Sequence, residues 1–283
     1  MTGAPRQVWA GAGWQQVYAR CRSVAPEAFE PDRVRNLWDG QWRLAGTPAA
    51  ATSPVDGSPI MGPPMLQLGQ GLEAVAAAAA EHQQWAGVEL EERRDRVARC
   101  VQELASHREL LALLLVWEIG KPWRQALTSV DRTISGVGWY LEEIEPMLAG
   151  RQPLAGPVSN IASWNYPLSV LVHAMLIQLL AGNAVIAKTP TDGGLCALTL
   201  AAACMRRCQL PVTLLSGSGS RLSPALVLSE EIGCLAFVGG RDAGGQIASQ
   251  LVQTDKRHML EQEGLNAWGI WQFSDWDTLA GHL

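Results

Sequence analysis

The sequence lacks a surplus of basic residues and any paired cysteine motif. Its 22 lysines and arginines against 27 aspartates and glutamates give a net charge of −5. A nucleic-acid partner is therefore not expected, because such binding selects for a basic surface. The six cysteines form no Cys-x-x-Cys unit, and the nearest two, Cys204 and Cys208, have no histidine close by in sequence. A disulfide framework and a metal site are not expected on this spacing.

An uninterrupted hydrophobic run long enough to span a membrane is also missing. No Asp, Glu, Lys or Arg occurs between Arg151 and Lys188, but Pro, Gly, Asn and His leave only 168–181 as a continuous helical run. A spanning helix needs about 20 apolar residues, so we expect a helix covered by protein and no membrane partner. Residues 1–13 lack the basic start and apolar run of a secretory signal, and we expect a cytoplasmic protein.

Several catalytic motifs are absent as well. The sequence contains no G-x-x-x-x-G-K-[ST], no H-E-x-x-H and no G-x-S-x-G, and its five histidines are dispersed. The dinucleotide fingerprint G-x-G-x-x-G is incomplete, because Leu222 stands where a third glycine would follow Gly217 and Gly219. These absences argue against a P-loop nucleotidase, a zinc protease and a serine hydrolase of the usual patterns.

The residues that are present predict a packed core. Hydrophobic residues make up 48% of the chain and charged residues 17%, which is typical of a globular protein. Residues 1–70 read as irregular, with a turn or hairpin tip at 53–59. From Leu72 the pattern is helical: an alanine-rich stretch at 74–80, one long apolar stripe over 97–118 that Gly120 and Pro122 end, and a further helix over 127–144.

Short apolar runs alternate with helical segments from Gly156 onward. We expect strands at 158–162, 184–187, 212–215 and 234–238, and helices at 167–181, 194–208 and 222–231. This alternation predicts an α/β fold, a parallel sheet with helices on both faces, in which ligands bind beyond the carboxyl ends of the strands.

Polar residues and glycines follow the predicted strands. Asn165 is a candidate amide donor to a substrate oxygen, or else caps the helix that begins at Pro167. Lys188 suits a phosphate or a ribose hydroxyl, or else is a solvated surface lysine. The glycines at 217–219 and 239–245 would let backbone amides approach a pyrophosphate at the start of a helix.

Five segments carry a family resemblance. Residues 117–122 read WEIGKP, 161–168 IASWNYPL, 181–188 AGNAVIAK, 210–219 LPVTLLSGSG and 236–244 AFVGGRDAG. In the same order they resemble the E-x-GKP, PWNFP, AGNAVVLKP, LPPGVLNVVTG and AFTGSTEVG segments of the aldehyde dehydrogenase superfamily. The resemblance runs from about residue 46 to 267 and implies that family's variant of the Rossmann fold, with a helical section and a hairpin arm before the sheet.

The resemblance also implies an activity and its residues. Family members oxidise an aldehyde to a carboxylic acid with NAD or NADP, through a cysteine thiolate that attacks the aldehyde. Asn165 would donate to the oxyanion, and Glu261 would activate water, its alternative being a surface carboxylate. The residues implied to bind the dinucleotide are Ser163, Trp164, Lys188, Thr191, Gly217, Gly219, Phe237, Gly239, Gly240 and Gly244.

The sequence departs from the family at two places near these residues. Residues 261–265 read EQEGL where the family typically has ELGGK. Thr191 stands where many NAD-dependent members have a glutamate that bonds the ribose 2′ hydroxyl, and 188–191 is similar to the NADP-using non-phosphorylating glyceraldehyde-3-phosphate dehydrogenases. Because no carboxylate at 191 repels a 2′ phosphate, we expect NADP to be accepted.

The family's nucleophilic cysteine lies beyond the glutamate, in a catalytic domain, whereas this chain stops at Leu283. The resemblance implies an extension at 1–45, an oligomerisation arm at 46–70, a helical part at 71–150, the cofactor-binding sheet at 151–267 and the start of a catalytic domain at 268–283. We expect the chain alone to be inactive; the alternatives are a catalytically dead nucleotide-binding module or one part of a split enzyme. Full-length members form homo-oligomers.

Overall fold

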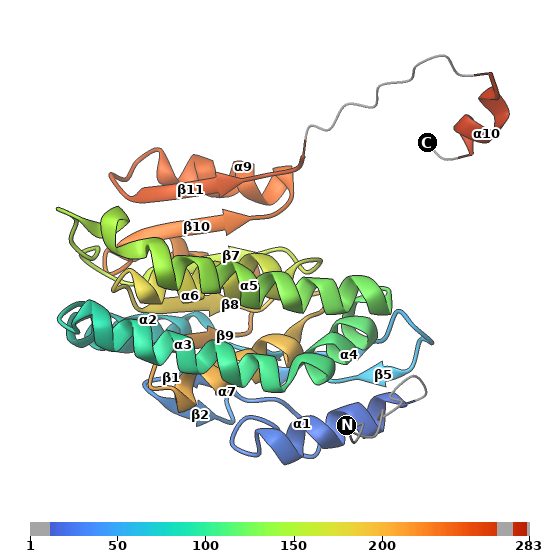
Figure 1. Ribbon diagram of the computed structural model, residues 1–283. Coiled ribbons are helices and arrows are strands. Elements are labelled where there is room, and N and C mark those ends of the chain that lie inside the picture. Colours follow the sequence, from blue (N-terminus) through green and yellow to red (C-terminus); the bar gives the residue numbers. More distant parts are fainter. Residues whose placement is uncertain (1–11, 265–273, 282–283) are drawn as a thin grey trace.

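A seven-stranded sheet forms the centre of the fold (Figure 1). The computed structural model describes residues 12–264 and 274–281. The strand order is β11-β10-β7-β8-β9-β1-β2, and the five strands from β11 to β9 are parallel. Their bounds are β7 Val158–Ala162, β8 Val185–Lys188, β9 Val212–Leu215, β10 Cys234–Val238 and β11 Arg257–Glu261. β8 and β9 are buried throughout, which is typical of parallel strands covered on both faces.

The predicted α/β fold is confirmed, but the sheet is not entirely parallel. β1 (Asn36–Trp38) pairs antiparallel with β9 and with β2 (Gln41–Arg43). Asp39 and Gly40 both have positive φ, 53° and 64°, which is the turn that an Asp-Gly pair forms between hairpin strands. Helix α1 (Trp14–Val24) precedes them. The expectation of an irregular segment over residues 1–70 was therefore wrong for these elements.

Strand β11 was also missed, because its sequence Arg-His-Met-Leu-Glu is polar and largely exposed. It lies at the edge of the sheet, where burial does not impose a continuous apolar run. Glu261 is its last residue, so this glutamate ends a fifth parallel strand rather than following the fourth.

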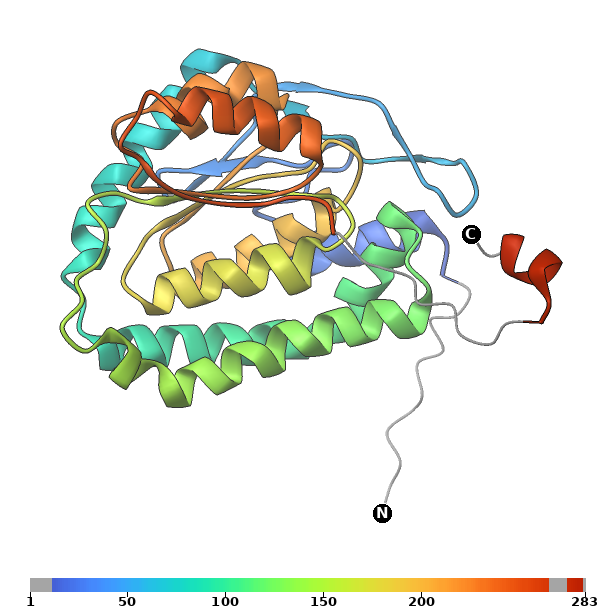
Figure 2. The ribbon, with the colours of Figure 1, turned by 90° about the horizontal axis from the view of Figure 1, so that it is seen from above.

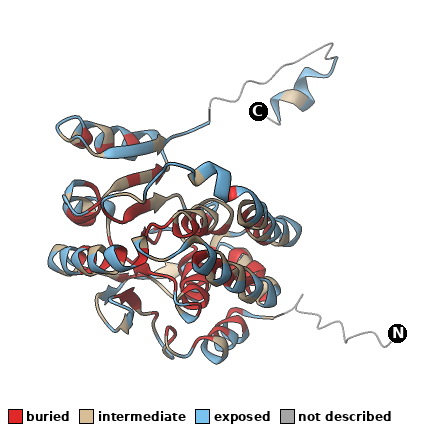
Figure 3. Ribbon diagram, turned by 60° about the vertical axis from the view of Figure 1, so that its left-hand side comes forward, coloured by how far each residue is buried: buried red, intermediate tan, exposed pale blue. Residues whose placement is uncertain are grey.

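Helices cover both faces of the sheet (Figure 2). On one side lie α3 to α7, and on the other α2, α8, η2 and α9. The two faces alternate along β8: Val185 and Ala187 belong to the larger core cluster, whereas Ile186 belongs to the second. This alternation is what successive residues of a strand must show. Figure 3 shows the buried residues concentrated on the sheet and on the inner faces of the helices.

The helix bounds differ from the sequence expectation at one informative place. The stripe over 97–118 is two helices, α3 (Leu90–Ser106) and α4 (Arg108–Ile119), separated at His107 with φ −105° and ψ 15°. The Ser106 hydroxyl donates to the Glu103 carbonyl at 2.7 Å, a local bond that competes with continuation of a helix. The other long helices are α2 (Leu68–Ala86) and α5 (Trp123–Leu148).

The crossover segments are mostly where expected. Residues 167–180 are helical, as η1 (Pro167–Val172) and α6 (His173–Leu180), and α7 spans Leu195–Arg207. The expected helix at 222–231 is instead α8 (Gly219–Ser223) followed by η2 (Pro224–Leu228). The helical segment begins earlier than expected because the Ser218 side chain accepts the Arg221 amide and so caps α8. Helix α9 spans Arg241–Leu251 and α10 spans Trp276–Ala280.

A hairpin is present at the expected place. β3 (Thr47–Pro48) pairs with β6 (Pro64–Met65), and β4 (Ala51–Thr52) with β5 (Pro59–Ile60). At its tip, the Ser53 hydroxyl donates to the Trp117 carbonyl at 2.7 Å, which ties the hairpin to the end of α4.

Across 12–264 and 274–281, no helix has the length and apolar character that crossing a bilayer requires. Trp268, Trp271 and Phe273, which the resemblance assigns to the start of a further domain, lie outside the described residues.

Candidate functional site

The order of strands reverses between β7 and β10. From β7 the chain builds β8 and β9 on one side, then crosses back and adds β10 and β11 on the other. In open α/β sheets such a reversal leaves a crevice at the carboxyl ends of the two central strands, because the connections leave in opposite directions. The crevice here lies where Ala162 and Val238 end their strands.

The strand register brings three predicted site residues to this crevice. Ala162 pairs with Val238, and Val238 pairs with Glu261. Ser163, Gly239 and Glu261 therefore lie at the same end of three adjacent strands. The Gly239 amide donates to the Glu261 carbonyl at 3.1 Å, which fixes the first residue after β10 against the end of β11.

A pocket opens on the α6 side of these strand ends. Its floor is formed by the ends of β7, β10 and β11, and its wall by η1 and the start of α6. The lining includes Asn160, Ala162, Ala236, Val238, Met259 and Glu261 from the strands, with Ser169 and His173 from the wall. Glu261 is exposed at the mouth, where a carboxylate can reach solvent and a bound molecule alike.

Asn165 lies in the loop that connects β7 to η1. Its Oδ1 accepts the Ser163 hydroxyl at 2.6 Å, and its backbone carbonyl accepts the Lys121 ammonium at 2.8 Å. That ammonium also lies 3.9 Å from the centre of the Tyr166 ring, a cation–π contact. Lys121 belongs to the WEIGKP segment, which therefore supports this loop.

The Asn165 side chain does not cap the following helix. The N-cap of η1 is Tyr166, and no side chain there bonds the helix backbone. With Oδ1 held by Ser163, the Nδ2 group has no hydrogen-bond partner in the part of the chain that the structure describes, and the residue is exposed. The capping alternative was wrong, and the amide group can still donate. Asn165 is not among the residues that line the pocket beside Glu261.

Lys188 is not a solvated surface lysine, since it is 6% exposed at the end of β8. Its ammonium donates to the Thr189 carbonyl at 2.7 Å. Burial lowers the pKa of Lys188 to about 8, against a smaller opposing effect of Asp192. Thr191 is exposed and lines a separate hollow with hairpin residues such as Thr52 and Ile60. The structure thus places Thr191 and Glu261 in different hollows.

The glycines divide into two groups. A Cβ atom at Gly217, Gly239 or Gly244 would stand 2.4–2.8 Å from Leu222, Phe237 or Gln262, so these three glycines permit internal packing. At Gly219 a Cβ would meet nothing within 4 Å, and at Gly240 only the Glu263 carboxylate, at 3.8 Å. Of these five glycines, Gly219 and Gly240 are therefore the two with open space in front of them; Gly245, in the same segment, has open space as well.

Two aromatic residues that the sequence grouped together have opposite surroundings. Phe237 is buried in a small cluster with Val227, Leu235 and Ile247 beneath α9. Trp164 is 46% exposed in the loop after β7. The structure brings Trp164 to the surface near the crevice and keeps the Phe237 ring inside the core.

Two glutamates were missed as site residues. Glu263 Oε1 accepts the Arg241 amide at 3.4 Å, at the start of α9. Glu118 is fully buried, and its two oxygens accept the Cys196 and Ala197 amides at 2.6 and 3.0 Å, which caps the start of α7. Burial raises the pKa of Glu118 to about 7. Both could have been noticed in the sequence. Glu263 stands where the family typically has a glycine, and Glu118 is a carboxylate on an otherwise apolar stripe.

None of the six cysteines, all of which the structure describes, lines the pocket beside Glu261. Cys196 and Cys204 are buried in α7, where burial raises the pKa of each thiol. Cys234 begins β10, at the end of the strand opposite the crevice. A buried thiol with a raised pKa is a poor nucleophile, because the thiolate is the reactive form.

The fold is that of a doubly wound α/β protein with a crevice at the switch point of its sheet. Residues 42–282 match the model described as the Aldehyde dehydrogenase family. The chain belongs to that family.

Individual relatives are similar over most of this chain. An aspartate-semialdehyde dehydrogenase (non-phosphorylating) of Halomonas elongata is 30% identical over 244 residues, covering 80% of this chain and 49% of its own length. An NADP-dependent glyceraldehyde-3-phosphate dehydrogenase of Pisum sativum is 26% identical, covering 92% and 57%. The chain thus spans about half the length of the curated relatives it matches.

Solved structures agree on the fold. An aldehyde dehydrogenase from Brucella melitensis biovar abortus superposes with a TM-score of 0.75 at 25% identity, over 81% of this chain and 51% of that one. An NADP-dependent glyceraldehyde-3-phosphate dehydrogenase from Bacillus halodurans, solved with NADP, gives a TM-score of 0.74 at 22% identity, over 82% and 53%.

Proposed function

We propose that this chain is the nucleotide-binding portion of an NAD(P)-dependent enzyme that oxidises an aldehyde to a carboxylic acid. The observation that carries the proposal is the alignment of Ser163, Gly239 and Glu261 at the switch point of the sheet, in a member of the aldehyde dehydrogenase family. A dinucleotide bound there would supply the hydride acceptor.

Asn165 is the proposed donor to the aldehyde oxygen. Ser163 holds Oδ1, so the Nδ2 hydrogens point away from that bond and remain available, and Lys121 anchors the backbone of the same residue. A donor fixed in this way stabilises negative charge on an oxygen without reorganising when the charge develops. Glu261, exposed at the mouth of the pocket, is proposed to take a proton from water.

Three residues around the crevice favour a nicotinamide dinucleotide, and one opposes it. The start of α9 has Gly240 as N-cap without a side-chain cap, and Gly219 has open space before it. Both features favour close approach of phosphate to backbone amides. Lys188, with its ammonium at the end of β8, would bond the ribose. Glu263 is the exception, because its carboxylate lies where a phosphate would gain most from α9.

The positions of the cysteines support a division of labour. Since none of the six lines the pocket, this chain would bind nucleotide and polarise an aldehyde but not form a covalent intermediate by itself. The same observation supports a second candidate, a nucleotide-binding module without catalysis, and a third, one part of an enzyme that a second polypeptide completes.

Nucleotide titration of the purified chain tests the proposal. We expect tryptophan fluorescence and calorimetry to report saturable NADP binding, and we expect Lys188→Ala to weaken it about tenfold. Lys256→Ala is the control, because Lys256 is a partly buried lysine that precedes the opposite end of β11. Equal weakening by both variants, or no binding at millimolar nucleotide, would contradict the proposed site.

Turnover separates the candidates. Incubated with NADP and a panel of aldehydes, the chain alone should release no reduced nucleotide. Sustained reduction that resists further purification would refute the division of labour. Restoration of turnover by an added polypeptide with a reactive cysteine would favour the split enzyme over the module.

A further inference from the structure

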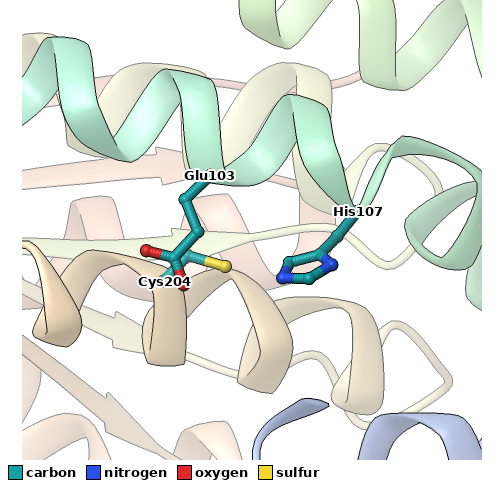
Figure 4. A group of neighbouring side chains, drawn as sticks. All are labelled: Glu103, His107 and Cys204. Carbon is teal, nitrogen blue, oxygen red and sulfur yellow. The ribbon is translucent and has the colours of Figure 1, made fainter.

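Three side chains of types that can bind a metal ion lie close together where α3 packs against α7. Glu103 lies in the last turn of α3, His107 is the residue that ends it, and Cys204 lies in the last turn of α7 (Figure 4). One ligand atom of each, a carboxylate oxygen, an imidazole nitrogen and a sulfur, lies within 4.8 Å of the other two.

We propose that Glu103, His107 and Cys204 form a binding site for a divalent cation of the zinc class. Sulfur, imidazole and carboxylate donors together select zinc over magnesium or calcium, which prefer oxygen alone. A tetrahedral zinc holds its ligand atoms about 3.3–3.8 Å apart, given bonds of about 2.0–2.3 Å. Closing the observed triangle therefore needs side-chain movements of about 1 Å. Three protein ligands leave a fourth position for water or another thiol.

Cys208 is the side chain placed to complete the site. It lies one turn after Cys204, and its sulfur is 3.6 Å from Glu103 Oε2. The other oxygen, Oε1, accepts the Arg207 guanidinium at 3.2 Å. A cation bound at Oε2 leaves this ion pair in place, so that Arg207 orients the carboxylate as outer partners of metal ligands do. Arg207 is itself neutralised by Glu27, at 2.7 Å.

The surrounding charges are compatible with a bound cation. Both α3 and α7 end at the site, and the carboxyl ends of helices carry partial negative charge. Burial lowers the pKa of His107, Glu103 acts against it, and Arg207 and Arg20 add to the lowering. The neutral imidazole is the form that binds metal.

Cys204 must give up a proton as the sulfur–metal bond forms. Burial and the neighbouring Glu103 raise the pKa of this thiol, while Arg207 acts against them. One proton is released to solvent for each cation bound, and the affinity consequently rises with pH. Cys208, Cys100 and Arg99 also face this cluster; the contact with Cys100, and to a smaller extent Arg99, lower the pKa of Cys208, against burial and Glu103.

The site has a route to solvent and a mechanical consequence. A hollow lined by Arg20, Ser106, His107 and Arg108 opens beside the imidazole. A cation bound here would join the break between α3 and α4 to the end of α7, and so add to the packing, the Arg207–Glu103 ion pair and the Glu118 hydrogen bonds that already connect these segments.

Cobalt substitution tests the site in the full chain. Protein without an affinity tag is first stripped of metal with a chelator under reducing conditions. Co²⁺ is then added, followed by Zn²⁺. One equivalent of Co²⁺ should give the thiolate-to-cobalt charge-transfer absorption and the visible bands of a tetrahedral ion, and Zn²⁺ should displace it. Cys204→Ser should abolish the charge-transfer absorption, and His107→Asn should weaken zinc binding about tenfold or more.

Cys234→Ser is the matched control, because Cys234 is a half-buried thiol in β10 and far from the cluster in the fold. The absorption should survive in this variant. Three results would overturn the proposal. The charge-transfer absorption could be missing from the unmodified chain although its circular dichroism shows that it is folded. The absorption could also persist in Cys204→Ser, or be lost equally in Cys234→Ser.

A second measurement needs no variant. Zn²⁺ should slow alkylation of Cys204 by at least tenfold, as mass spectrometry resolves it, while Cys234 in the same sample keeps its rate. Equal rates at Cys204 with and without zinc would also overturn the proposal.

Discussion

Glu118 of α4 caps the start of α7, a helix far from it in the sequence: Glu118 Oε1 accepts the Cys196 amide at 2.6 Å. The carboxylate lies in α4, is 3% exposed and also accepts the Ala197 amide. A negative charge at the start of a helix is favourable, but a buried carboxylate must be fully hydrogen-bonded to be tolerated. This contact therefore couples two helices of the same layer.

Removing this cap should destabilise the fold. Glu118→Ala leaves the Cys196 and Ala197 amides unpaired in the core, and we expect a loss of about 3 kcal/mol in the free energy of unfolding. Urea denaturation followed by circular dichroism measures it. The matched variant Glu109→Ala removes an exposed glutamate from the first turn of the same helix and should cost under about 0.5 kcal/mol. Equal effects would disprove the capping role.

The same carboxyl group predicts a pH dependence of stability. Burial raises the pKa of Glu118 from its ordinary 4.5 to about 7. Between these values the folded chain holds a proton that the unfolded chain has released, so this contribution to stability decreases as pH rises from 4.5 to 7 and is constant above. The total change is about 3 kcal/mol. Denaturation of the Glu118→Gln variant at several pH values should lack this component, and a slope identical to that of the unmodified chain would contradict the assignment.

Neutralising Glu263 should strengthen nucleotide binding. Its carboxylate bonds the Arg241 amide at the start of α9, where it competes with phosphate for the favourable end of the helix. We expect Glu263→Gln to lower the dissociation constant for NADP about threefold, the effect decreasing with added salt. Glu230→Gln, a neutralisation before the opposite end of β10, should leave the constant unchanged. Weaker binding by Glu263→Gln would show that the carboxylate supports the site instead.

A carboxylate at position 191 should discriminate against NADP. Thr191 lies exposed in the hollow beneath the hairpin. Thr191→Glu places a negative charge against a 2′ phosphate, and we expect the dissociation constant for NADP to rise about tenfold while that for NAD changes little. Thr52→Glu adds the same charge across the same hollow. If both variants lose NADP equally, the discrimination arises from net charge alone.

The sequence was sufficient for the fold where burial dictates residue type. Strands β7 and β10 were located to the residue, because each is a short run of small or apolar residues between turn-forming segments. Strand β11 was not, since an edge strand tolerates Arg257 and His258. The division of one apolar stripe at His107 escaped notice because the stripe continues in both α3 and α4.

For the site, the sequence identified the residues at strand ends but not their partners. The burial of Lys188 and the position of Glu263 depend on how loops fold back, which local pattern does not encode. The approach of His107 to Cys204 joins residues almost a hundred positions apart, beyond the reach of any motif spacing.

The two edges of the central sheet differ in a way that matters for self-association. One edge is formed by β2, a strand of three residues in which Gln41 is exposed and Trp42 and Arg43 are partly buried. The other is β11, five residues long, whose outer backbone groups carry no further strand within the described ranges, beside a Met259 side chain that is 52% exposed. Unpaired amides and carbonyls of that length template the addition of another strand. We therefore expect that a neighbouring polypeptide that extends the sheet would add to β11, next to the crevice, where the unpaired edge is longer than at β2.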